Sequence, residues 1–117
     1  AEVAGLPHVS LQPSAGSHGE LAGVLLTRAY HADRGDERTT VLTPDTAHGT
    51  NPATVTMAGY EVVKVGTAPD GGVDLDDLRR KADERTACLM LTNPNTLGLF
   101  DPNIEEIARI VHDAGAT

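Results

Sequence analysis

Short runs of β-branched and apolar residues alternate in this chain with longer segments of helical pattern, and this alternation limits the possible folds more than any other feature. The strand-like runs are residues 39–43, 60–65 and 86–92. Strands that are separated by helices do not pair as hairpins, so we expect them to lie parallel in one sheet with helices on its faces. The sequence therefore predicts an α/β fold of three layers.

The segments between these runs carry helix signals. We expect a helix over residues 20–34, a short helix that Asn51 caps and Gly59 closes, and a polar helix that begins at Asp74 and continues to about residue 84. The first of these has apolar residues at helical spacing, namely Leu21, Val24, Leu25 and Ala29. Residues 6–11 are expected to be extended.

The clearest helix follows Asp101 and Pro102 and ends at Gly115. Its apolar face comprises Ile104, Ile107, Ala108, Ile110, Val111 and Ala114. We expect Ile104, Ile107 and Val111 to pack on the strands. The sequence stops shortly after this helix, where a further strand is expected, so we interpret it as part of a larger domain.

The composition is globular, with 39% hydrophobic and 22% charged residues. The net charge of −8 argues against a nucleic-acid partner, because phosphate binding needs a basic surface. No apolar stretch approaches the ~20 residues of a membrane span, so we expect no membrane association. The acid excess is ordinary for a soluble cytoplasmic protein.

Neither a disulfide nor a metal site is expected. Cys88 is the only cysteine, and it lies in an apolar run, which favours a buried strand thiol over a nucleophile. The five histidines show no HxH or HxxxH spacing, and no cysteine pair exists.

Function in a parallel sheet concentrates in the loops that follow the carboxyl ends of strands or open a helix. The loop at residues 12–19 contains small residues before a helix, whose N–H groups and dipole favour a phosphate, with Ser14 or Ser17 as an additional hydroxyl donor. The alternative for this loop is a plain helix cap.

Two further loops carry polar residues of interest. The loop at 43–52 places His48 between a strand and a helix, where it could stack on a flat cofactor, transfer a proton or bond to a backbone carbonyl. The loop at 92–98 offers threonine and asparagine side chains to a ligand, although a turn that needs Asn, Pro and Gly is the alternative.

The order of these loops resembles the three-layer large domain of the aspartate-aminotransferase-like (fold type I) enzymes that depend on pyridoxal phosphate (PLP). The strings LQPSAGSHGELAG, RAYHADRGD, TPDTAHGTNPATVTMAG, GGVDLDDL and LMLTNPNTLGLF resemble the glycine decarboxylase family, the P-proteins of the glycine cleavage system, and most of all the catalytic subunit 2 of its two-subunit form. The resemblance covers essentially all 117 residues, and it implies that 1–117 is part of one PLP-binding large domain.

The resemblance also implies three groups of cofactor contacts. Small residues at the helix start would hold the PLP phosphate, and these are Ser14, Ala15, Gly16 and Ser17. His48 would stack on the pyridine ring. Thr92 and Thr96 would lie near the phenolic oxygen of the ring or near the substrate, whereas Asn95 stands where relatives often have serine.

Two family residues have no counterpart in this sequence. The aspartate that pairs with the pyridine nitrogen and the lysine that forms the Schiff base lie beyond Gly115 in the family pattern, so the resemblance implies truncation before both segments. The only lysines are Lys64 and Lys81, and we expect both to be solvated charges. By itself the segment is expected to be inactive.

The implied parent enzyme is an oxidoreductase of glycine catabolism. It decarboxylates glycine with PLP and passes the aminomethyl group to the lipoyl arm of the H-protein, and the other glycine decarboxylase subunit is a further partner. A bacterial-type enzyme would be cytoplasmic and a eukaryotic one mitochondrial. The alternatives are another PLP-dependent decarboxylase or lyase, or a non-catalytic binding or assembly segment.

Overall fold

A single parallel sheet forms the centre of the molecule. The computed structural model describes residues 1–117 and contains the strands β1 (Thr40–Pro44), β2 (Glu61–Val65) and β3 (Thr86–Leu89). They lie in the order β2-β1-β3, and both neighbouring pairs are parallel. The predicted parallel sheet is therefore confirmed, although β3 is shorter than the predicted run of residues 86–92.

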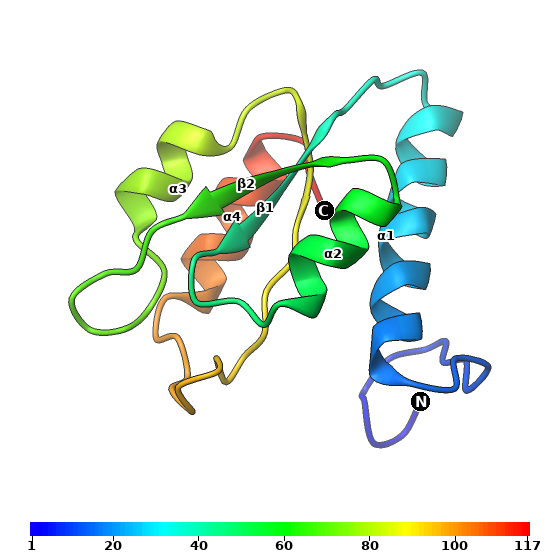
Figure 1. Ribbon diagram of the computed structural model, residues 1–117, viewed down its shortest axis with the longest axis horizontal. Coiled ribbons are helices and arrows are strands. Elements are labelled where there is room, and N and C mark those ends of the chain that lie inside the picture. The colour runs from blue at the N-terminus through cyan, green and yellow to red at the C-terminus, as the bar shows by residue number, and fades with distance from the viewer.

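Four helices cover the sheet in two layers (Figure 1). These are α1 (Gly16–Asp33), α2 (Thr50–Met57), α3 (Leu75–Lys81) and α4 (Ile104–Asp113). Successive side chains of a strand point to opposite faces, so Val41 of β1 packs in a cluster with residues of α1 and α2, while Leu42 packs with residues of α3 and α4. The three-layer prediction is thus confirmed.

Helix α1 differs most from its prediction. It begins at Gly16 rather than at residue 20, and Val24 and His31 are its only fully buried residues. Leu25 is 46% exposed. The side of α1 that faces the sheet contains Val24, as predicted, and also His31, whose Nε2 bonds to the carbonyl of Ala87 at 2.9 Å, whereas Leu25 and Ala29 lie outside this face.

Smaller differences occur in the other elements. Gly49 rather than Asn51 precedes α2, and Asn51 is buried inside its first turn. In α4, Ile107 and Val111 are buried as predicted, whereas Ile104 is exposed at the rim. Residues 6–11 form no strand.

Two acidic side chains near its amino-terminal end anchor helix α3. Asp74 caps it as predicted, because its carboxylate accepts from the N–H groups of Asp76 and Asp77 at 3.0 and 3.1 Å. The carboxylate of buried Asp77 accepts from Lys81 Nζ at 2.7 Å and from the backbone N–H of Gly66 at 2.8 Å. Lys81 is therefore an ion-pair partner rather than the solvated charge that we expected.

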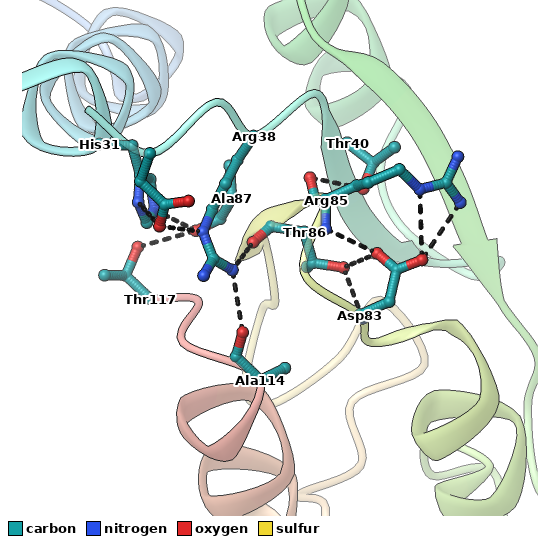
Figure 2. A network of polar contacts seen from close by, with 10 residues as sticks. His31, Arg38, Thr40, Asp83, Arg85, Thr86, Ala87, Ala114 and Thr117 are labelled. Atoms are coloured by element: carbon teal, nitrogen blue, oxygen red, sulfur yellow. Dashed lines mark hydrogen bonds and ion pairs between the residues drawn. The ribbon is translucent and has the colours of Figure 1, made fainter. Parts of the chain in front are cut away.

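A polar network ties the elements together at the amino-terminal edge of the sheet (Figure 2). The guanidinium of Arg38 donates to the carbonyls of Thr86 and Ala114 at 2.7 and 2.9 Å and to the carboxylate of Asp36 at 2.6 Å. The side chain of Arg38 is only 9% exposed. This edge is therefore occupied by structural contacts that link β3 to the end of α4.

Cys88 is buried in β3, as predicted, and its burial raises the pKa of the thiol to about 11. None of the four helices has both the length and the apolar character that crossing a membrane requires.

Candidate functional site

The topology creates a crevice at the carboxyl edge of the sheet. β1 leads into α2 on one face of the sheet, whereas β3 leads into α4 on the other. Loops that part in this way leave room outside the strand ends, where open α/β sheets bind ligands. The loops after β1 and β3 and the amino-terminal end of α1 all lie on this side, toward the lower edge of the view (Figure 1).

The start of α1 offers unpaired backbone donors. The N–H groups of Ala15, Gly16 and Ser17 have no acceptor within the chain, and no side chain caps the helix. Its first turn contains no acidic residue. The hydroxyl of Ser14 contacts Nδ1 of His18 at 2.8 Å. All four predicted phosphate contacts are therefore brought together, and all are exposed.

The geometry of this turn corrects one detail of the sequence interpretation. Residues 12–19 do not form a single loop, because Gly16 and Ser17 belong to the first turn of the helix and Ala15 precedes it in an extended conformation. Gly16 does not adopt a positive φ. Its contribution is space, since a Cβ added there would meet no atom within 4 Å.

His48 lies in the loop after β1 with an exposed side chain. Its Nδ1 accepts from the backbone N–H of Thr50 at 3.2 Å and contacts the hydroxyl of Thr50 at 2.9 Å. A backbone N–H can only donate, so Nδ1 carries a lone pair and the neutral ring has its proton on Nε2. The ring faces and Nε2 remain available to a ligand.

The loop after β3 separates the two predicted threonines. Thr92 is exposed and its hydroxyl has no partner within the chain, so it is available to a ligand. Thr96 instead donates its hydroxyl proton to the carbonyl of Thr46 at 2.7 Å. The amide of Asn95 is also used within the protein, because it donates to the carbonyl of Gly71 and accepts from the N–H groups of Leu97 and Leu99.

Two contacts at this edge were missed by the sequence reasoning. The hydroxyl of Thr67, in the turn after β2, donates to the carboxylate of Asp45. Together with the bond from Thr96 to Thr46, this contact fixes the first two residues after β1 from both sides. No local pattern signals such pairs, because their members are far apart in the sequence.

The space between these loops is of two kinds. A pocket between Thr46, Thr92, Asn95 and Asp101 encloses about 20 Å³, which suffices for one water molecule. A larger groove of about 320 Å³ lies between the first turns of α1 and the segment from Cys88 to Leu91. Glu20 lines this groove, and its Oε2 atom is buried without a hydrogen-bond partner. No group of three or more histidine, cysteine, aspartate or glutamate side chains is arranged to hold a metal ion.

Curated proteins similar to this chain share one name. A protein of Rhodopirellula baltica and one of Legionella pneumophila, each named probable glycine dehydrogenase (decarboxylating) subunit 2, are 59% identical to it over 116 residues. A protein of Thermosipho africanus with the same name is 55% identical over 116 residues. These matches cover 98–99% of this chain, which spans 23–24% of the length of those relatives. No family model matches the sequence.

Solved structures similar in fold are those of PLP-dependent enzymes of fold type I. A sphingosine-1-phosphate lyase of Burkholderia pseudomallei superposes with a TM-score of 0.78 and 27% identity, over 87% of this chain and 24% of that one. The Oryza sativa protein TDC, solved with PLP and tryptamine, gives a TM-score of 0.74 over 87% of this chain and 25% of that one, and at 19% identity it supports the fold alone. The predicted fold class is thus confirmed, and over nearly its whole length the chain is 59% identical to a segment of longer proteins named probable glycine dehydrogenase (decarboxylating) subunit 2.

Proposed function

We propose that residues 1–117 are part of the PLP-binding large domain of a glycine decarboxylase and supply one side of its cofactor site. The observation that carries this proposal is the 59% identity over 116 residues to proteins named glycine dehydrogenase (decarboxylating) subunit 2. The position of the three predicted loops on the carboxyl side of the sheet supports it.

The start of α1 fits the phosphate group of PLP. A phosphate dianion needs several converging donors and no competing negative charge. The free N–H groups of Ala15, Gly16 and Ser17, the absence of acidic residues in the first turn and the open space beside Gly16 meet these requirements. The hydroxyls of Ser14 and Ser17 would add donors.

The remaining predicted residues have separate roles in this proposal. His48 would place its ring against the pyridine ring, held in its orientation by Thr50. The free hydroxyl of Thr92 would bond to a polar atom of the cofactor or of glycine. Bound PLP supplies the electron sink for decarboxylation, whereas this part of the chain binds and orients it.

The covalent link to the cofactor would come from outside residues 1–117. Lys81 is held by Asp77 on α3 and donates to the carbonyl of Lys64, and Lys64 lies on β2 with its side chain exposed. Neither lysine is in the crevice between β1 and β3. The segment alone would therefore be inactive, and the aspartate and lysine of the family would belong to neighbouring parts of the domain.

The complete enzyme would act on glycine together with the other glycine decarboxylase subunit and would pass the aminomethyl group to the lipoyl arm of the H-protein. A cytoplasmic location fits a bacterial-type enzyme. Another PLP-dependent decarboxylase or lyase and a non-catalytic assembly segment are the competing functions, and both predict no glycine-dependent release of carbon dioxide.

The phosphate site is tested by titrating PLP into the full-length protein and its Gly16→Val variant. Valine at this exposed helical position would fill the space beside the free N–H groups without a folding penalty, since glycine is the poorer helix former. We expect PLP affinity to fall at least about tenfold, equivalent to about 1.4 kcal/mol. Gly16→Ala is the matched control and should lose less, and His48→Ala should also lose less because the phosphate contacts remain. Unchanged affinity in Gly16→Val would mean that the start of α1 is only a helix terminus.

A further inference from the structure

We propose that Thr67 and Thr96 are positioning residues for His48, and that Thr96 acts through the backbone of the histidine loop rather than by touching the cofactor. This inference rests on the proposed function for the role of His48. The histidine loop is defined here as residues 45–49, between the end of β1 and the start of α2.

The first two residues of the histidine loop are fixed from opposite sides. The carboxylate of Asp45 accepts a hydrogen bond from the hydroxyl of Thr67, which follows β2. The carbonyl of Thr46 accepts from the hydroxyl of Thr96 at 2.7 Å, and Thr96 follows β3. Since β1 lies between β2 and β3, the two threonines hold the loop from both neighbouring strands.

The loop that carries Thr96 is itself held in place by hydrogen bonds of the neighbouring Asn95 side chain. The side chain of Asn95 donates to the carbonyl of Gly71 at 3.1 Å and accepts from the N–H groups of Leu97 and Leu99, each at 3.0 Å. The loop that carries Thr96 is thereby attached to the turn after β2, close to Thr67. A rigid support is what allows one hydroxyl to set the position of a neighbouring loop.

The side chain of His48 is exposed, and the only hydrogen bonds of its ring within the chain are to Thr50. Its backbone carbonyl accepts from the N–H group of Asn51 at 3.0 Å, and the N–H group of Ala47 donates to the carbonyl of Pro44 at 3.0 Å. The ring position therefore depends on where the backbone of the histidine loop runs, and the Thr96–Thr46 bond adds a side-chain tether to that backbone two residues before His48. The hydroxyl proton of Thr96 is committed to this bond, so it is not free to donate to a cofactor.

The test compares valine and serine at both threonines in the full-length protein. Valine keeps the shape and removes the hydroxyl, whereas serine keeps the hydroxyl. We expect Thr96→Val and Thr67→Val each to weaken PLP binding about three- to tenfold, as the loss of one neutral hydrogen bond predicts, and Thr96→Ser and Thr67→Ser to bind like the parent. The visible circular dichroism band of bound PLP, which reports the orientation of its ring, should change in the valine variants and not in the serine variants.

A double-mutant cycle separates positioning from direct contact. In a His48→Ala background, Thr96→Val should lower PLP affinity by less than about twofold, because the residue that it positions is gone. An undiminished loss in that background would overturn the proposal, since it would place Thr96 in direct contact with the cofactor. Unchanged affinity and an unchanged band in both valine variants would overturn it as well.

Amide hydrogen exchange, measured on the protein without PLP, tests the two hydrogen bonds independently of whether the protein binds PLP. Both valine variants should speed amide exchange across residues 45–50, and both serine variants should not. If exchange responds in this way while PLP fails to bind the parent protein, the two threonines hold the loop and the proposed cofactor is wrong. If exchange is unchanged in the valine variants, the hydrogen bonds of Thr67 and Thr96 do not hold the loop, and the inference fails whether or not the protein binds PLP.

Discussion

Asp77 is a buried acidic residue that holds helix α3 to the rest of the protein. Three donors converge on its carboxylate, from Lys81, from the backbone of Gly66 and from Arg80, and they hold its pKa well below the usual range, with Lys81 as the largest cause. Asp77 is 8% exposed, so water does not replace these partners freely. It connects α3 to the end of β2.

We expect Asp77→Asn to lower the free energy of unfolding at pH 7 by about 1–3 kcal/mol. Because the pKa of Asp77 is lower in the folded than in the unfolded protein, its contribution is complete above the unfolded pKa of about 4 and is lost as pH falls toward the folded pKa. Urea denaturation at pH 7 and at decreasing pH measures the difference between variant and parent, which should shrink below pH ~4. Asp76→Asn is the matched control, since Asp76 is exposed and should matter little. A difference that stays constant with pH would contradict the ion-pair account.

At this scale the position of His48 could be predicted from the sequence, whereas the hydrogen-bond partner of Thr96 could not. His48 was expected at a strand end before a helix, and it lies there because the strand, the loop and the helix are all encoded locally. Thr96 was expected to face a ligand, yet its hydroxyl is committed to Thr46, fifty residues earlier in the chain. Hydrogen bonds of this kind depend on which strands become neighbours, and no local pattern encodes that.

The elements are held together at the amino-terminal edge by Arg38. Its guanidinium bonds to the carbonyls of Thr86 at the start of β3 and of Ala114 at the end of α4, and it pairs with Asp36 (Figure 2). A cation at a helix carboxyl end is favourable because the carbonyls there lack partners. One side chain thus joins a strand to the helix that follows it.

We expect Arg38→Met to destabilise the protein by about 2–3 kcal/mol, because it leaves two carbonyls without a donor in a largely buried setting. Arg109→Met is the control, as Arg109 is exposed and pairs only with Glu106. Thermal unfolding of both variants of the full-length protein tests this expectation. If the two variants melt at the same temperature, Arg38 does not join β3 to α4.

The sequence predicted that each helix occurs, but it predicted less well where a helix begins and which of its sides is buried. All four helices occur where expected, and the cap at Asp74 was identified from its position alone. The start of α1 was missed because glycine and serine read as loop residues, whereas no tertiary contact prevents them from entering the helix. Its buried face was predicted in part, because Val24 is buried, but Leu25 is exposed and His31 lies on the side that packs against β3.

At the scale of the whole molecule, the strand order β2-β1-β3 decides where function can lie. The sequence predicted parallel strands but not their order, since order depends on which helix covers which face. With β1 in the centre, the crevice falls between β1 and β3, and the loops that carry His48 and Thr92 lie on the same side of the sheet as the start of α1 (Figure 1). The opposite edge contains the polar network around Arg38, which joins β3 to α4.

The central claim is that this edge binds PLP in a glycine decarboxylase, and a crystal structure of the full-length protein with PLP tests it most directly. The account predicts phosphate oxygens within about 3 Å of the N–H groups of Gly16 and Ser17, with the pyridine ring against the ring of His48. It also predicts that Thr96 still donates to the carbonyl of Thr46 and that the covalent bond to the cofactor involves neither Lys64 nor Lys81. PLP bound away from the start of α1, or bound covalently to either of these lysines, would contradict the account.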